Sequence, residues 1–221
     1  MHGLFITGTD TGVGKTEVTA AIARLWRRQG RDFAVSKPVA TGGGRDAGDT
    51  LRLARAAGEA DLEAVTPFAF AEPAAPPVAA RASGARLTLE GLAEAVRRRH
   101  RPGGAVLVEG VGGLLCPLSD EHAVADLAFV LGLPLVVVAR RSLGTLNHTL
   151  LTVESARARG LRLAGVVVSE AAPVAGLAEQ SNVEELRRLG VPVLAVVPYR
   201  AGGYEEEIPA VSAVDWWSLA R

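Results

Sequence analysis

The sequence contains a single cysteine and a single methionine among its 221 residues. One cysteine excludes an internal disulfide and suits a reducing compartment, so we expect a cytoplasmic protein. The thiol, Cys116, stands between apolar residues and Pro117, which offer it no adjacent base. We therefore interpret Cys116 as a structural residue and not as a nucleophile.

Long apolar runs and an excess of charge of either sign are also lacking. No stretch approaches the ~20 apolar residues that span a bilayer, and no basic and apolar leader pattern is present. The net charge is zero and the pI is about 6.9, so we expect neither nucleic acid nor a membrane as a partner. The basic run at 97–101 ends a predicted helix, where it suits the helix dipole.

Lysine is almost absent. Lysine and arginine together number 24, yet lysine stands only at positions 15 and 37. An ammonium is a compact point charge, whereas a guanidinium is a broad planar fork. Because this chain otherwise uses arginine as its cation, we infer that Lys15 and Lys37 both require an ammonium. Chance survival is the alternative for Lys37.

Short apolar, β-branched runs alternate with helical patterns that often end on glycine. Together with the glycine-rich loop at 8–16, this predicts one domain over residues 1–221, an α/β fold with a three-layer, doubly wound, mostly parallel sheet of the P-loop NTPase type. The predicted strands are Leu4–Thr7, Phe33–Ser36, Ala105–Val108, Leu135–Ala139, Leu163–Val168 and Val193–Val197. The predicted helices are Thr16–Gln29, Gly48–Ala57, Leu89–Arg99, Val124–Leu131, Thr145–Arg159, Leu177–Leu189 and Val214–Ala220. The proline-rich stretch at 64–85 excludes a long regular element.

The loop at 8–16 (GTDTGVGKT) lies between a predicted strand and a predicted helix. Such a loop directs backbone N–H groups at a phosphate, with Lys15 reaching the outer phosphates and the Thr16 hydroxyl reaching Mg²⁺. The match to GxxxxGK[ST] is imperfect, because Thr9 takes the place of the first glycine. A glycine-rich turn that binds nothing is the alternative.

Two carboxylates could hold a metal ion beside this loop. Glu109 ends a predicted strand, at the edge of the sheet where ligand groups gather in α/β proteins, and a structural role as a cap or turn acid is the alternative. Asp49 opens a predicted helix, where a plain helix cap is the alternative. Mg²⁺ prefers six oxygens, which Thr16, Asp49, Glu109 and phosphate oxygens would supply. The stretch at 142–148 begins a long helix and could either hold a carboxylate on its free amides or be an ordinary helix start.

Six motifs together resemble the dethiobiotin synthetases, a family of biotin biosynthesis, over almost the whole chain. They are GTDTGVGKT at 8–16, SKPVATG at 36–42, PFAFAEPAAPP at 67–77, VEGVGGLLCPLSD at 108–120, LGTLNHTLLT at 143–152 and LAGVV at 163–167. The residue at position 9 and the lysine at position 37 are family traits. The resemblance implies that CO2 and 7,8-diaminopelargonate are joined with ATP to give dethiobiotin, ADP and phosphate, through a carbamate and a carbamic-phosphoric anhydride.

The resemblance also implies site residues. The implied catalytic residues are Lys37, Lys15 and Thr11, and the implied Mg²⁺ ligands are Thr16, Asp49 and Glu109. The implied ATP-binding residues are Gly12, Val13, Gly14, Lys15, Thr16, Glu17, Asp49, Glu109, Gly110, Val111, Gly112, Ser169, Glu170, Pro198, Tyr199 and Arg200. The substrate would bind Thr41 and, because family members are homodimers, Thr145, Leu146 and Asn147 of the partner subunit.

The sequence departs from the family at some of these positions. Ser169-Glu170 stands where Asn-Asp is frequent, which leaves the choice of nucleotide base open, and Ser142 replaces a common lysine. One rival interpretation is a partition or septum-site ATPase, but Asp10 replaces the second loop lysine of that class. An amidotransferase acting on cobyrinic acid would need a glutaminase domain and a catalytic cysteine. A phosphate-loop protein with another substrate is the remaining alternative.

Overall fold

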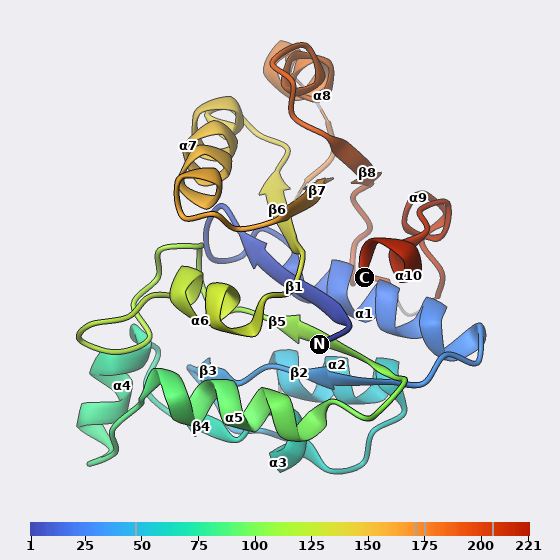
Figure 1. The fold of residues 1–221 in the computed structure, drawn as a ribbon. Helices are drawn as coiled ribbons and strands as arrows, with labels where there is room; N and C mark the ends of the chain where they lie inside the picture. The colour runs from blue at the N-terminus through green and yellow to red at the C-terminus, as the bar shows by residue number, and fades with distance from the viewer. Residues whose placement is uncertain (47, 171, 175, 205) are drawn as a thin grey trace.

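Figure 1 shows the protein as a computed structural model, which describes residues 1–46, 48–170, 172–174, 176–204 and 206–221. Its centre is a parallel sheet of six strands in the order β2-β5-β1-β6-β7-β8. Their bounds are β1 Gly3–Gly8, β2 Phe33–Ser36, β5 Ala105–Glu109, β6 Leu135–Arg140, β7 Leu163–Ser169 and β8 Val193–Val197. Each predicted strand is confirmed to within one residue at either end.

Helices cover both faces of the sheet, which confirms the doubly wound α/β fold. Residues of α1, α2, α9 and α10 share one hydrophobic cluster with the strands. Residues of α4, α5, α6, α7 and α8 share the other. The bounds are α1 Lys15–Arg28, α2 Gly48–Ala57, α3 Leu62–Val65, α4 Pro76–Ala82, α5 Leu89–Arg99, α6 Val124–Leu131, α7 Thr145–Ala158, α8 Leu177–Arg188, α9 Pro209–Ser212 and α10 Trp216–Leu219.

The proline-rich stretch contains only short elements, as predicted. These are α3, α4 and β4, which spans Phe68–Phe70 and pairs in parallel with β3 at Val39–Thr41. The small second sheet was not predicted, because three residues are too few to show a strand pattern. Its strand β3 follows β2 in the sequence, and its pairing with β4 places Thr41 beside the proline-rich segment.

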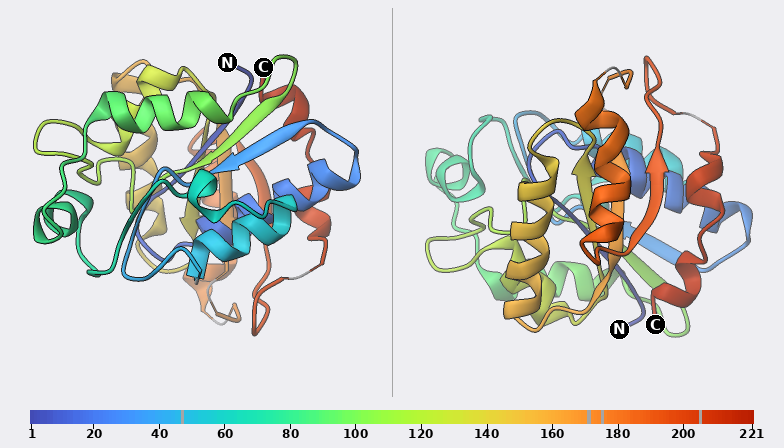
Figure 2. Two further views of the ribbon diagram at one scale, coloured as in Figure 1. Left: turned by 90° about the horizontal axis from the view of Figure 1, so that it is seen from below. Right: turned by 90° about the horizontal axis from the view of Figure 1, so that it is seen from above.

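The carboxy-terminal helix is shorter than predicted. Instead of one helix over Val214–Ala220, the structure has α10 at Trp216–Leu219, and the unpredicted α9 precedes it. Asp215 caps α10, since its carboxylate accepts the N–H of Ser218 at 3.1 Å. The two ends of the chain lie side by side (Figure 2), where the N–H of Gly3 donates to the carbonyl of Ala220 at 2.8 Å. None of the helices among the described residues combines the length and the apolar character that a membrane span requires.

The strand order assembles one edge of the sheet. β5 lies between β2 and β1, so the segments that follow these three strands leave the sheet as neighbours. Ile6 of β1 is level with Glu109 of β5, and Ser36 of β2 is level with Val108. The phosphate loop, Glu109 and Lys37 therefore meet at the carboxyl edge, where parallel α/β sheets bind ligands.

Candidate active site

The loop after β1 has the backbone of a phosphate-binding loop. Gly12 and Gly14 both have positive φ, 69° and 98°, and Gly14 is the N-cap residue that directly precedes α1. A Cβ on Gly14 would lie 2.5 Å from Oγ of Ser169, so both the backbone and the space require glycine there. The first amides of α1 consequently face the loop, with the positive end of the helix dipole behind them.

Lys15 lies almost buried inside this loop, with 7% of its surface exposed. Its Nζ donates to the carbonyl of Asp10 at 2.9 Å. Burial lowers the pKa of Lys15, and the repulsion from Lys37 adds to the effect, while Glu109 and the aspartates oppose it. An anion near Nζ, such as a phosphate, would raise this pKa again and so favour the charged ammonium.

Lys37, directly after β2, bridges two carboxylates. Its Nζ lies 2.5 Å from Oε1 of Glu109 and 2.9 Å from Oδ2 of Asp49. Lys37 and Glu109 are 4% and 0% exposed, whereas the Asp49 side chain is half exposed. Burial alone would lower the pKa of Lys37, but the charges of Glu109 and Asp49 more than offset it and raise the pKa. Burial would likewise raise the pKa of Asp49, and the charge and hydrogen bond of Lys37 lower it instead.

Thr16 joins the same group and completes an oxygen-rich site. Its hydroxyl donates to Oε1 of Glu109 at 2.9 Å. The second oxygen of that carboxylate, Oε2, is buried and has no hydrogen-bond partner among the described residues. An orphaned buried carboxylate oxygen is costly unless a cation or donor satisfies it. Thr16, Asp49 and Glu109 thus fit a hard cation such as Mg²⁺.

No group of three or more His, Cys, Asp or Glu side chains forms a metal centre within the described ranges. A cation at Thr16, Asp49 and Glu109 would therefore complete its shell with phosphate or water oxygens. This is the usual arrangement for Mg²⁺, which dehydrates reluctantly and binds through one or two carboxylates and a nucleotide.

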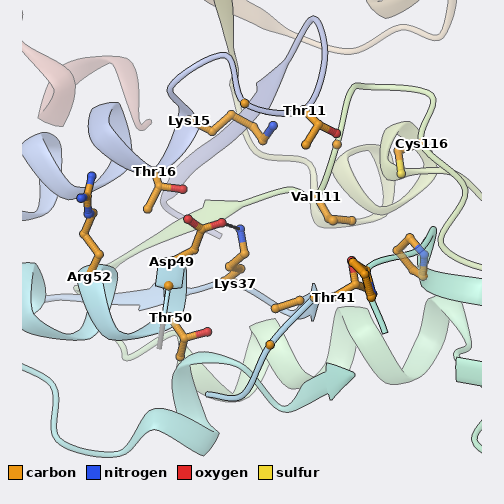
Figure 3. Close-up of a pocket in the computed structure, with 18 of the residues that line it drawn as sticks. Thr11, Lys15, Thr16, Lys37, Thr41, Asp49, Thr50, Arg52, Val111 and Cys116 are labelled. Atoms are coloured by element: carbon orange, nitrogen blue, oxygen red, sulfur yellow. Dashed lines mark hydrogen bonds and ion pairs between the residues drawn. The ribbon is translucent and has the colours of Figure 1, made fainter. Parts of the chain in front are cut away.

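A cavity of about 760 Å³ opens from the phosphate loop (Figure 3). The labelled Thr11, Lys15 and Thr16 surround one part of it, with Lys37 and Asp49 in the middle and Thr41 farther along. The cavity is large enough for a nucleotide phosphate group together with a small substrate. Of the expected site residues, those lining it are Thr11, Gly12, Gly14, Lys15, Thr16, Glu17, Lys37, Thr41, Asp49, Val111 and Gly112.

Several lining residues were missed by the sequence reasoning. They come from β3 and the loop after it, from α2, from the proline-rich segment and from the loop after β5: Ala40, Gly42, Gly43, Gly44, Gly48, Thr50, Arg52, Pro73, Ala74, Ala75, Pro76 and Cys116. Gly42 donates its N–H to the carbonyls of Phe70 and Glu72, both at 3.1 Å, and so ties the proline-rich wall to β3. The high density of glycine in the loop after β3 and of proline in the proline-rich segment was the sequence signal that could have identified these two parts of the lining.

Gly110, Val111 and Gly112 form the loop after β5. Gly112 has a φ of 62°, and a Cβ there would lie 2.9 Å from Sγ of Cys116. Cys116 thus packs against the loop, and burial raises the pKa of its thiol, which the charge of Lys15 partly opposes. This supports the interpretation of Cys116 as a structural residue, and it places the thiol on the cavity wall.

The residues expected to bind the base lie together at the ends of β7 and β8, beyond the lining of this cavity. They are Ser169, Glu170, Pro198, Tyr199 and Arg200. Oε1 of Glu170 pairs with Arg141 at 2.6 Å, and Oε2 accepts the N–H of Tyr199 at 3.0 Å. Both carboxylate oxygens therefore hold neighbouring segments in place.

The expected substrate-tail residues lie apart from the cavity. Thr145, Leu146 and Asn147 begin α7, where Thr145 is buried and Asn147 is exposed. Leu143, just before the helix, is 83% exposed. A single chain does not bring these residues to Lys37, so their expected role depends on a second copy and stays a prediction.

Comparison with known proteins identifies relatives over nearly the whole chain. A family model described as an AAA domain matches residues 2–205. The ATP-dependent dethiobiotin synthetase BioD of Anaeromyxobacter dehalogenans (strain 2CP-C) is 48% identical over 191 residues, which cover 86% of each chain. The protein of the same name from Bacillus thuringiensis (strain Al Hakam) is 37% identical over 227 residues, covering 100% of this chain and 93% of the relative.

Solved structures resemble the fold at lower identity. The cell division protein FtsY of Thermotoga maritima matches with a TM-score of 0.51 and 14% identity, covering 96% of this chain and 66% of that one. The MinC:MinD cell division complex of Aquifex aeolicus matches with a TM-score of 0.55 and 15% identity, covering 90% and 82%. These similarities support the P-loop NTPase fold, and identity this low carries nothing about activity.

Proposed function

Because the chain belongs to the ATP-dependent dethiobiotin synthetase family of ligases, we propose that it converts 7,8-diaminopelargonate, CO2 and ATP to dethiobiotin, ADP and phosphate. The observation that carries the proposal is the position of Lys37. Its ammonium lies in the cavity wall between the phosphate loop and Thr41, held by two carboxylates. A cation there can meet both a transferring phosphoryl group and an anionic carbamate.

The reaction we propose has three steps. One amine of the diamine attacks CO2, forms an N–C bond and loses a proton, which gives a carbamate. A carbamate oxygen then attacks the γ-phosphorus of ATP, and ADP leaves. The second amine attacks the carbonyl carbon of this mixed anhydride, phosphate leaves and the amine loses its proton, which closes the ureido ring. Negative charge shifts between carbamate and phosphoryl oxygens throughout, so fixed positive charge lowers each barrier.

We assign the residues to these steps by position. The amides of 12–17 and the Lys15 ammonium would hold the phosphates. Lys37 would stabilise the carbamate and the incoming phosphoryl oxygens, with Thr11 and Thr41 beside it on the cavity wall. The segments at 110–112, 169–170 and 198–200 would complete the nucleotide site. The rigid contacts of Lys37 hold its ammonium in place before substrate arrives, which is the condition for electrostatic catalysis.

Mg²⁺ fits this proposal as the metal of the nucleotide complex. Thr16, Asp49 and Glu109 would hold it, and the unpartnered Oε2 of Glu109 supports the assignment. When bound, the ion would neutralise charge on the phosphate oxygens during transfer. Lys37 shares its two carboxylates with the ion and would help fix their orientation.

The substrate's distal carboxylate needs a partner outside this cavity. We propose a homodimer in which Thr145, Leu146 and Asn147 of the second copy supply amides at a helix start, a common carboxylate site. The exposed Leu143, just before that helix, and the exposed Leu151, in its middle, favour such a contact. We also propose a cytoplasmic enzyme, since a single cysteine suits a reducing compartment.

The deciding experiment measures phosphate release from ATP with Mg²⁺ and bicarbonate, with and without 7,8-diaminopelargonate, and follows dethiobiotin by mass. The proposal expects phosphate release only with the diamine, matched by one dethiobiotin per phosphate. Hydrolysis that ignores the diamine would contradict it and favour a switch ATPase. Absence of turnover with this diamine but turnover with another would indicate a synthetase for a different substrate.

A further inference from the structure

Glu17 connects three parts of the chain. It stands in the first turn of α1, directly after Thr16, and its side chain is only 15% exposed. Its Oε1 accepts a hydrogen bond from the guanidinium of Arg52 on α2. Its Oε2 lies 3.3 Å from the backbone N of Tyr204, in the segment that follows β8. One carboxylate thus joins the phosphate-loop helix to both neighbours.

On the α2 side, Arg52 follows Asp49 by three residues, and residues three apart lie on the same face of a helix. Figure 3 shows both side chains on α2, facing the start of α1. Asp49 contacts Lys37 and Arg52 contacts Glu17, so this face of α2 is held at two points. Loss of the Glu17 contact would remove one of these two polar contacts between α2 and its neighbours.

On the other side, the segment at 198–204 is held together by its own contacts. The hydroxyl of Tyr204 donates to the carbonyl of Pro198 at 3.0 Å, and the Arg200 guanidinium lies 5.5 Å from the Tyr204 ring centre. Gly203 donates its N–H to the Arg200 carbonyl at 3.0 Å. These contacts make the segment a compact unit, so a contact that fixes the position of Tyr204 also fixes the residues at 198–200.

Gly203 fits closely against the same carboxylate. Its φ is +77°, and a Cβ there would lie 2.9 Å from Oε1 of Glu17 and 3.3 Å from the Arg52 guanidinium. Only glycine allows the backbone to approach the Glu17–Arg52 pair this closely. The approach leaves Glu17 partly desolvated, which makes the loss of either donor costly.

We propose that Glu17 is a positioning residue for nucleotide binding. Its carboxylate fixes the segment at 198–204 and helix α2 against the phosphate loop and so sets the spacing between the phosphate and base ends of the nucleotide site. Arg52 acts through Glu17. The inference rests on the proposed function, because the base site at 198–200 belongs to it.

The test compares Glu17→Gln, Arg52→Gln and the double variant by ADP binding in calorimetry and by steady-state kinetics with ATP. Each single substitution should weaken ADP binding and raise KM for ATP by about tenfold, the effect of losing one charge-assisted contact. The change should fall more on KM for ATP than on kcat, because Lys15 and Lys37 keep their own contacts. Because Glu17 and Arg52 act through one ion pair, the double variant should bind ADP no more weakly than the single variant with the lower affinity.

Two further variants separate positioning from folding. Arg52→Lys keeps the charge and should restore most of the affinity, whereas Gly203→Ala should weaken ADP binding without changing any charge. The matched control is Arg98→Gln with Glu94→Gln, an exposed pair on α5 that should leave ADP binding unchanged. Unchanged ADP binding in Glu17→Gln would overturn the proposal, as would a loss in Arg52→Gln alone, which would mean that Arg52 touches the nucleotide directly. If the unsubstituted chain bound no ADP, the proposed function itself would fall.

Discussion

The Nζ of Lys37 lies 2.5 Å from Oε1 of Glu109, and Glu109 is fully buried. Such a pair costs more to desolvate than a surface pair, so it is weak as a device for stability. It is better explained by function, because it holds an ammonium at one defined point beside the phosphate loop. The half-exposed Asp49 is the second carboxylate that binds this ammonium, and its charge helps to keep the ammonium protonated.

Lys37→Arg tests whether the site needs an ammonium. A guanidinium is wider and planar, so it cannot place its charge where the ammonium lies between Glu109 and Asp49. We expect MgATP binding to survive while dethiobiotin formation falls by about 10²-fold or more, the effect of losing a preorganised charge contact. Product measured by mass, with ATP binding by calorimetry, decides it. Near-normal turnover would show that any cation serves there.

Glu109→Leu and Lys37→Met test the energetics of the buried pair. Glu109→Leu alone leaves a buried ammonium with only Asp49, and we expect the free energy of unfolding to fall by about 3 kcal/mol. The double variant removes both buried charges, so it should be more stable than Glu109→Leu alone. Urea denaturation of the four proteins gives the coupling. Additive losses would mean that the two side chains do not act as a pair.

The sequence pattern was sufficient for the main sheet, because buried parallel strands are apolar and glycine ends several of the helices. It also identified Lys37 from rarity, and it grouped Asp49 and Glu109 with Thr16 as ligands of one metal ion. It could not show that Lys37 bridges the two carboxylates, since the strand order β2-β5-β1 depends on long-range pairing. Arg52 was missed because an arginine on a helix surface resembles any solvated cation. The small sheet of β3 and β4 was missed because strands of three residues are too short to show an alternating hydrophobic pattern.

Asp49→Asn tests the metal site. An amide oxygen is a weaker ligand than a carboxylate, so we expect the Mg²⁺ concentration for half-maximal activity to rise by about tenfold. The matched control is Asp32→Asn, an exposed aspartate paired with Arg101 away from the cavity. Titration of Mg²⁺ at saturating ATP and diamine distinguishes the two. An unchanged Mg²⁺ requirement would return Asp49 to the role of a helix cap that orients Lys37.

The same variant has a pH signature in stability. The pKa of Asp49 in the folded protein lies below its ordinary value of 3.8, because the charge and hydrogen bond of Lys37 outweigh burial. Ionised Asp49 therefore stabilises the fold above about pH 4, and that stabilisation is lost as the pH falls toward the lowered pKa. We expect the wild type to exceed Asp49→Asn in stability at neutral pH and the difference to shrink below about pH 4. Urea melts at several pH values measure it, and a constant difference would contradict the ion pair.

Cys116 offers a chemical probe of the cavity, because it is the chain's single thiol. Burial raises its pKa, so less thiolate is present at neutral pH than for a free cysteine. We expect iodoacetamide to label the folded protein at least about tenfold more slowly than the protein in urea, with a rate that rises steeply with pH. Nucleotide and diamine together should slow labelling further, since Cys116 lines the same cavity as Lys15 and Thr41. Cys116→Ser provides the unlabelled control, and mass spectrometry gives the rate. Labelling that ignores both ligands would place the substrates elsewhere than beside this thiol.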